Sequence, residues 1–343
     1  MSVAETSDTV SETANEAQPE PRDAMPLRIV RRLANSRELT LFILVVLLAL
    51  AMTIAYPHNF PTGPNLRAVL LNLATVGILV CGMMLLMIAG TFDLSVGSTL
   101  ALSGVWAGVV AGWWGWPAEA AILIGIAVGA LAGLVNGLIV TRIGINALIA
   151  TLGTLTIYRS LTYVTAGTGV TPISDAFAEY GRAADPILRL QSPFWAMLVL
   201  VLVGGWLVAR TRFFRQFYFV GGNPRAAQLS GIRVDRLVLI GFVIMGALAG
   251  LAGVLGAARL NSAVVNAGVG IELKVITATV LGGASLKGGE GTILGGILGV
   301  LFIALIENAM IINAVGVFWQ GLVVGLVLLF AVSLDRFKTS GRG

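Results

Sequence analysis

Long apolar runs separated by short polar loops dominate this 343-residue sequence and restrict the folds open to it. A bilayer core of about 30 Å needs about 20 helical residues, and most of the runs reach that length. The run at 271–284 is short and could be a half-helix. Only 11% of the residues are charged, against about a quarter in a soluble domain, so we predict an all-α polytopic membrane protein. The ten runs, each a candidate transmembrane helix, lie at residues 39–56, 67–90, 94–112, 118–140, 145–166, 193–209, 237–258, 271–284, 292–313 and 315–334.

The segment before the first run has a different composition. Residues 1–26 are rich in Ser, Thr, Glu and Ala and show no apolar period, which favours a disordered cytoplasmic tail. A single transmembrane domain at 27–343 follows. Arg28, Arg31, Arg32 and Arg37 precede the first apolar run, as expected for an uncleaved anchor.

Ten crossings with both termini in the cytoplasm give a clear asymmetry of basic residues. About sixteen of the 22 Lys and Arg residues then lie inside and about four outside, as the positive-inside rule requires. Arg159 and Lys274 are left within the spans. This topology places the loop at 210–236 in the cytoplasm, whereas nine crossings would move one terminus outside and weaken the asymmetry.

The loop at 210–236 carries six arginines between two apolar runs. It contains a short helix whose two ends are marked. Asn223 suits the N-cap, Pro224 suits the first helical position, and Gly231 suits the left-handed residue after the end. Such a helix could be gripped by another protein, or it could rest on lipid headgroups as an amphipathic loop helix.

Glycines recur at intervals of four residues in three of the runs. Such ridges let helix backbones approach closely in lipid, where no hydrophobic force drives helices together. We interpret them as helix-packing features. The glycines are Gly125, Gly129, Gly133 and Gly137, then Gly246 and Gly250, then Gly295 and Gly299.

The sequence also contains a weak internal repeat. A shift of 179 positions pairs Asp93 with Glu272 and aligns residues 93–104 with 272–283, including two leucines, a valine and a glycine. In the ten-span topology the first segment starts inside and the second starts outside. The two halves would then have opposite orientations, as in inverted-repeat transporters. Chance similarity between Gly-, Ala- and Leu-rich spans is the alternative.

Several polar residues within the spans are candidates for a substrate path. An acid at the start of a helix, as predicted for Asp93 and Glu272, is also stabilised simply by the helix dipole. Glu307 lies inside an apolar run, where ionisable groups face a cavity or pair with each other. Arg159 and Lys274 are its available partners, so a structural ion pair competes with a role in the path. The candidate path residues are Asp93, Ser95, Asn136, Thr151, Arg159, Glu272 and Glu307.

Other classes of function find little support in the residues. His58 and Cys81 are the sole His and Cys, so neither a catalytic constellation, a metal site nor an internal disulfide is predicted. The glycine-rich segment at 283–289 has Lys287 at the wrong place for a phosphate-binding loop, so we expect no nucleotide site on this chain. The basic residues lie mainly in loops between apolar runs, which does not indicate nucleic-acid binding.

Five motifs in order give the chain a family resemblance. From about residue 66 to 335 it resembles the permease subunits of ribose-type and xylose-type sugar importers of the ATP-binding cassette class. It departs from the usual family pattern at residues 89–91 (AGT), at Asn146 and Ala147, and at Lys274, which puts the substrate's identity in question more than the transporter class. The motifs are residues 92–98 (FDLSVGS), 151–159 (TLGTLTIYR), 221–232 (GGNPRAAQLSGI), 280–292 (VLGGASLKGGEGT) and 318–320 (FWQ).

The resemblance implies a complete set of partners. A second permease copy would form a dimer around a central path, a periplasmic or extracellular sugar-binding protein would deliver a monosaccharide or related polyol, and a cytoplasmic ATPase would bind ATP and magnesium. The chain would lie in a bacterial inner membrane with both termini in the cytoplasm. The resemblance also implies that the loop helix is a coupling helix that docks into the ATPase. Its residues would be Gly222, Asn223, Pro224, Arg225, Ala226, Ala227, Leu229, Ser230 and Gly231.

Two other functions are compatible with the residues. A secondary transporter driven by an ion gradient could bind a proton or sodium at Asp93, Glu272 or Glu307. A purely structural membrane subunit is the third possibility. Transport that depends completely on an ATPase would favour the permease of an ATP-binding cassette importer over these two functions.

Overall fold

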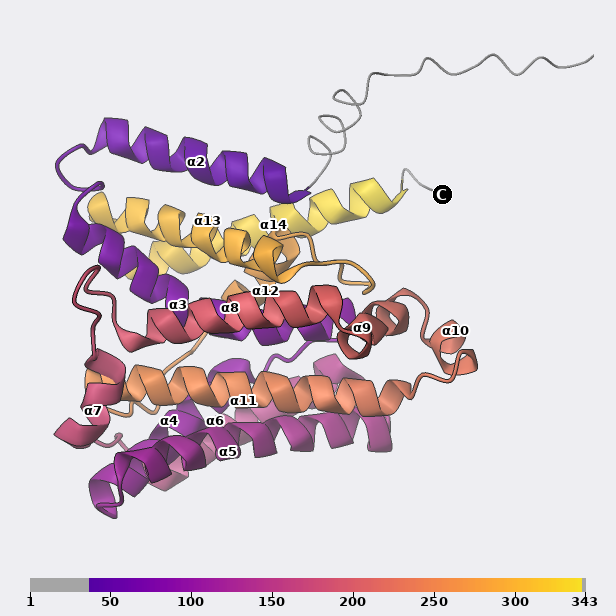
Figure 1. Cartoon of the computed structure of the whole chain (residues 1–343), viewed down its shortest axis with the longest axis horizontal. Coiled ribbons are helices and arrows are strands. Elements are labelled where there is room, and N and C mark those ends of the chain that lie inside the picture. The colour runs from indigo at the N-terminus through magenta and orange to yellow at the C-terminus, as the bar shows by residue number, and fades with distance from the viewer. Residues whose placement is uncertain (1–36, 341–343) are drawn as a thin grey trace, which may run out of the picture. The chain divides into compact units, whose positions relative to one another are not determined.

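The computed structural model describes residues 37–340, so the predicted tail at 1–26 lies outside the described part of the chain. Within that part the fold is helical throughout (Figure 1), and two short π-helical segments, η1 and η2, extend α4 and α5. The elements are α2 (Arg37–Ala55), α3 (Gly63–Ile88), α4 (Val96–Gly108), η1 (Val109–Trp113), α5 (Ala118–Leu138), η2 (Ile139–Ile143), α6 (Ala147–Ala166), α7 (Asp175–Arg182), α8 (Ser192–Arg210), α9 (Arg212–Gly222), α10 (Pro224–Leu229), α11 (Val234–Leu260), α12 (Ile271–Leu281), α13 (Ile293–Ile312) and α14 (Val317–Ser340).

Each predicted apolar run contains one long or medium helix, and the all-α membrane fold is confirmed. In the described residues, 7 helices are long and apolar enough to cross a membrane. Helix α6 is not among them because its run carries Tyr158, Arg159 and several threonines, and α12 has only 11 residues. The number of ten crossings therefore stays a prediction, and the short helix suggested by the 271–284 run is present.

Helix α3 forms the centre of the main core. Its residues from Val76 to Ile88 are buried one after another, so this half of the helix is enclosed on all sides. Met197 of α8 lies over Gly77, and Met245 of α11 lies over Gly82. A helix buried all round should be apolar all round, and the sequence of α3 meets that requirement.

The predicted glycine ridge brings α5 and α11 into backbone contact. A Cβ atom on Gly133 would lie 2.1 Å from the carbonyl oxygen of Phe242, and one on Gly246 would lie 2.2 Å from that of Gly129. Gly299 packs in the same way against the carbonyl of Ala278, joining α13 to α12. The packing interpretation of these glycines is confirmed, since a side chain at any of them would force the helices apart.

The two ends of the bundle carry different features. Helices α9 and α10 project beyond the other helices at one end, and α7 lies at the opposite end (Figure 1). We call these the α10 end and the α7 end. Helix α2 begins and α14 finishes at the α10 end. An even number of crossings requires this arrangement.

Candidate functional site

Helix α10 has the caps that its sequence predicts. The side-chain oxygen of Asn223 accepts hydrogen bonds from the backbone N–H groups of Arg225 (3.1 Å) and Ala226 (3.0 Å). Pro224 is the first helical residue. Gly231 has φ +83°, and the N–H of Ile232 donates to the carbonyl of Ala227 across the helix end (3.0 Å). These bonds satisfy both ends of a helix that is otherwise too short to be stable.

One residue anchors α10, and the rest of the helix faces outward. Ala227 is buried in the main core. Leu229 is 86% exposed, and Arg225 lies on the exposed surface near the opposite end of the helix. The outward side of α10 therefore presents an apolar and a basic side chain that the rest of the described chain leaves exposed. The exposed members of the predicted coupling set are Gly222, Asn223, Pro224, Arg225, Ala226, Leu229, Ser230 and Gly231.

The last turn of α9, directly before α10, packs onto two links between helices. A Cβ atom on Gly221 would lie 1.9 Å from the carbonyl oxygen of Ile88 and 2.4 Å from the backbone nitrogen of Gly289. That nitrogen donates a hydrogen bond to the same carbonyl (2.9 Å). Gly90 and Gly288 complete the contact, each with positive φ. We call Gly90, Gly221, Gly288 and Gly289 the glycine junction.

A side chain supports the glycine junction. The hydroxyl of Tyr218, one turn earlier on α9, donates to the carbonyl of Gly291 (2.7 Å). Helix α9 is therefore joined to the α3–α4 link (89–95) and to the α12–α13 link (282–292). A displacement of α9 and α10 has to be accommodated at the end of α3 and in the α12–α13 link, because glycine backbones pack directly against each other there.

The starts of α4 and α12 meet inside the bundle. A Cβ atom on Gly97 would lie 2.3 Å from the carbonyl oxygen of Gly268 and 2.8 Å from a carboxylate oxygen of Glu272. The prediction that Asp93 and Glu272 begin helices on opposite sides of the membrane is therefore wrong. Helix α12 is about 16 Å long at 1.5 Å per residue, so it covers only part of a bilayer core.

The two helices nevertheless run in opposite directions, as the predicted repeat requires. Helix α4 runs parallel to the end of α11. Gly104 lies beside Gly253, and Gly108 lies beside Ala263, just after α11. Helix α12 instead runs parallel to α3, and α3 is antiparallel to α11. Near the ends of α12 and α3, the Thr279 hydroxyl donates to the sulfur of Met87 (2.9 Å). The pair thus diverges from one internal point toward the two ends of the bundle.

Three predicted path residues form one buried polar cluster with a fourth residue. Asp93 is 2% exposed, and one of its oxygens accepts from the N–H (2.8 Å) and the hydroxyl (2.7 Å) of Ser95. The amide of Asn136 donates to both Asp93 oxygens and to the Ser95 hydroxyl. Tyr158 donates to Asn136 in turn (3.2 Å). This Asp93 cluster ties the start of α4 to α5 and α6, and its hydrogen bonds compensate for burial.

Tyr158 was missed in the sequence, although a pattern there points to it. Thr151, Thr154, Tyr158 and Thr162 recur at helical spacing on α6, and all four are buried. Polar residues repeated on one face of an apolar helix predict a buried polar face. Thr151 itself donates to the carbonyl of Ala147 (2.7 Å), so it satisfies its hydroxyl within its own helix.

Arg159 and Glu307 have different partners, although the sequence allowed them to pair. Arg159 donates to the carbonyls of Val265 (2.7 Å) and Ala267 (2.9 Å) and so holds the segment between α11 and α12. Glu307 pairs with Lys274, at 2.5 Å between the ammonium nitrogen and a carboxylate oxygen. The ion pair joins α12 to α13, with both side chains mostly buried.

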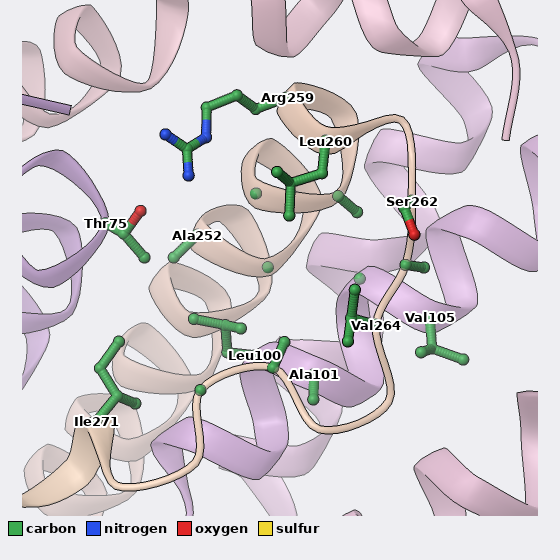
Figure 2. Close-up of a pocket in the computed structure, with 17 residues that line it drawn as sticks. Thr75, Leu100, Ala101, Val105, Ala252, Arg259, Leu260, Ser262, Val264 and Ile271 are labelled. Carbon is green, nitrogen blue, oxygen red and sulfur yellow. The ribbon is translucent and has the colours of Figure 1, made fainter. Parts of the chain in front are cut away.

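A pocket of about 160 Å³ lies next to the meeting point of α4 and α12 (Figure 2). Its wall consists of α4, the end of α11, the segment that Arg159 holds, the first residue of α12 and Thr75 of α3. Thr75, Arg259 and Ser262 supply its polar side chains, and Arg259 extends from α11 toward Thr75. None of the seven predicted path residues lines it. No sequence pattern predicts this pocket, because its wall is largely glycine, alanine and leucine.

The chain is similar to known proteins over most of its length. Residues 65–332 match the family described as "Branched-chain amino acid transport system / permease component". The chain is 37% identical over 304 residues to the ribose import permease protein RbsC of Escherichia coli (strain K12), covering 87% of this chain and 93% of that protein. No solved structure matches it.

Two further relatives show the same degree of similarity. The L-arabinose ABC transporter permease protein AraH of Azospirillum brasilense is 36% identical over 318 residues, with 91% of each chain covered. The autoinducer 2 import system permease protein LsrC of Klebsiella pneumoniae is 36% identical over 308 residues, covering 89% of this chain and 88% of that protein.

Proposed function

The chain belongs to the family of branched-chain amino acid transport system permease components, and we propose that it is the membrane permease of a sugar importer of the ATP-binding cassette class. The single observation that carries this proposal beyond the family is α10. A capped helix with an exposed Leu229 and Arg225, seated on the ends of two internal links, is suited to receive force from a partner protein.

In this function the energy comes from a separate ATPase that binds ATP and magnesium. Import against a hundredfold gradient needs about 2.8 kcal/mol, because each tenfold corresponds to about 1.4 kcal/mol. The ATPase would dock at the α10 end, and a sugar-binding protein would deliver its cargo at the α7 end. A second permease copy would complete the path between them. Force on α10 would reach α4 and α12 through the glycine junction.

The pocket of Figure 2 is suited to a monosaccharide on that path. Its polar groups are few, with Arg259 as a charged donor and the hydroxyls of Thr75 and Ser262, and the rest of its wall is apolar or glycine backbone. A sugar ring offers hydroxyls on its rim and C–H groups on its faces, which matches such a wall. The pocket adjoins the starts of α4 and α12, where a change in the angle between these helices would alter its shape.

Reconstitution into liposomes tests the function. The permease would be combined with the proposed ATPase and sugar-binding protein, and uptake of labelled ribose, arabinose and related sugars would be measured with and without ATP. We expect uptake only when all three proteins and ATP are present. Uptake by the permease alone, driven by a proton or sodium gradient, would instead establish the secondary transporter.

A separate measurement tests the orientation. An accessibility tag placed after Arg215 should react only from the cytoplasmic side, and a tag near Tyr180 only from the opposite side. These positions lie at the α10 end and the α7 end of the bundle. Reaction of both tags from the same side would overturn the proposed topology.

A further inference from the structure

A second pocket, of about 410 Å³, lies at the α10 end between α9, the end of α10 and the first turns of α11. Its volume falls in the range of about 300–1,000 Å³ that small-molecule sites occupy. Neither the proposed path nor the glycine junction uses it. The side chains that matter for its chemistry are Phe213, Gln216, Ser230, Arg233, Arg236 and Ile240.

The polar side of this pocket is basic. Arg233 and Arg236 are both exposed, and within residues 37–340 neither has an acidic side chain at ion-pair distance. Asp235, which lies between them in the sequence, is not part of the pocket wall. Gln216 and Ser230 add neutral hydrogen-bonding groups. Two arginines and two neutral hydrogen-bonding side chains in one pocket wall suit a phosphate group, which accepts several hydrogen bonds at once.

The pocket wall also contains apolar side chains that are partly exposed. Phe213 is 39% exposed and Ile240 is 36% exposed. Ile240 lies six residues into α11, which corresponds to about 9 Å along the helix axis. Ile240 therefore lies one turn, about 6 Å, beyond Arg236 along a helix that is long and apolar enough to span a membrane, which places Ile240 on the acyl-chain side when the arginines lie at the headgroups.

We propose that this α9–α11 pocket binds an anionic phospholipid, with the phosphate on Arg233 and Arg236 and the acyl chains along Phe213 and Ile240. The combination of a basic headgroup side and a membrane-facing apolar side carries the proposal. A soluble phosphate compound would contact only Arg233 and Arg236. A protein that approaches from the aqueous side would not reach Ile240. Basic pockets at helix ends next to the membrane are suited to anionic headgroups.

The site has a consequence for α10. Ser230 and Gly231, which end α10, form part of the same pocket wall. A bound lipid would therefore press against the end of the helix that the ATPase is proposed to grip. The lipid site itself does not depend on the proposed sugar transport, so each can fail without the other.

Binding to the purified full chain tests the proposal. The probes are phosphatidylglycerol and phosphatidylcholine, with occupancy measured by native mass spectrometry. We expect the double variant Arg233→Gln/Arg236→Gln to weaken phosphatidylglycerol binding by at least about tenfold, as loss of two charge-assisted contacts predicts. The control variant Arg210→Gln/Arg212→Gln removes the same charge from the same loop, but neither residue lines the pocket. It should change binding by no more than about twofold.

Three results would overturn the proposal. Equal loss of binding in the two double variants would show a diffuse attraction to the basic loop rather than a site. Full displacement of the lipid by millimolar glycerol 3-phosphate would identify a soluble phosphate compound as the ligand. Unchanged lipid binding together with lost ATPase association would assign the pocket to the docking surface.

Discussion

The backbone of Gly221 rests directly on the carbonyl oxygen of Ile88, so closely that a Cβ atom there would lie 1.9 Å from that oxygen. This contact joins the last turn of α9 to the end of α3. The neighbouring Gly222 has no atom within 4 Å of its own Cβ position. An added methyl group would therefore clash at Gly221, whereas the Cβ position of Gly222 is open.

We expect Gly221→Ala to uncouple transport, because the added methyl group must push α9 away from the α3–α4 and α12–α13 links. Sugar uptake should fall at least about tenfold while basal ATP hydrolysis by the assembled importer changes by less than about twofold. Gly205→Ala on α8 is the matched control and should transport normally, because nothing lies within 4 Å of its Cβ position and it belongs to neither the coupling helix nor the glycine junction. Equal effects of the two substitutions on uptake would show that the glycine junction does not transmit force.

The exposed tip of α10 should be required for assembly. Leu229→Asp places a charge where an apolar contact is expected, and Arg225→Glu reverses a charge on the same helix. Either should abolish co-purification of the ATPase and sugar uptake, with the permease still folded and inserted. The control is Leu188→Asp, since Leu188 is 56% exposed in the loop after α7 at the opposite end. Normal uptake by both α10 variants would contradict the docking role.

Substitution of Arg259 should weaken sugar binding and leave the association of the permease with the ATPase unchanged. Arg259→Met removes the charged donor from the pocket of Figure 2 but keeps much of the side-chain volume. We expect uptake at low sugar concentration to fall by about tenfold or more, with recovery as the delivered concentration rises, because loss of a buried polar contact weakens binding. Arg189→Met, at the same end but outside the pocket, should behave as the unmodified protein. A uniform loss independent of sugar concentration would assign Arg259 to folding.

The Lys274–Glu307 ion pair should show strong coupling between its two partners. Removing one partner of a fully buried pair costs about 3–5 kcal/mol, and the partial exposure of these side chains reduces that figure. We expect Lys274→Met and Glu307→Gln each to lower the thermal unfolding temperature. The double variant Lys274→Met/Glu307→Gln, which combines the same two substitutions, should be more stable than either single variant. Additive losses would show that the two groups act independently.

The two acids of the predicted repeat should respond differently to neutral substitution. In Asp93→Asn, the new NH₂ group would face the donors of Ser95 or Asn136, which costs about 1–3 kcal/mol of stability. Glu272→Gln should leave the unfolding temperature unchanged, because Glu272 lies outside that cluster, but lower uptake by about tenfold. Normal uptake by Glu272→Gln would show that Glu272 only stabilises the start of α12 and has no role in transport.

Local features of this protein could be predicted from the sequence, whereas its internal meeting points could not. The caps of α10 depend on Asn223, Pro224 and Gly231, which are close together in the chain. The contact between the starts of α4 and α12 instead depends on an inward-folded segment that Arg159 holds by two backbone carbonyls. Every residue has a backbone carbonyl, so the sequence does not show which carbonyls accept these hydrogen bonds.

The choice of partner for Glu307 shows the same limit. Arg159 and Lys274 were equally available in the sequence, and the distinction arises from the packing of α12 against α13. The Asp93 cluster is an intermediate case. Its acid and its serine are adjacent in the sequence, but Asn136 and Tyr158 join them from two other helices.

The glycine junction also limits how such importers can be recombined. Its four glycines come from three separate stretches of the chain, near residues 88–90, 218–222 and 287–291. A chimera that exchanges only the loop at 210–236 would place a foreign α9 on native backbone surfaces shaped for another helix. Retargeting this permease to a different ATPase therefore calls for grafting all three stretches together, as one discontinuous module.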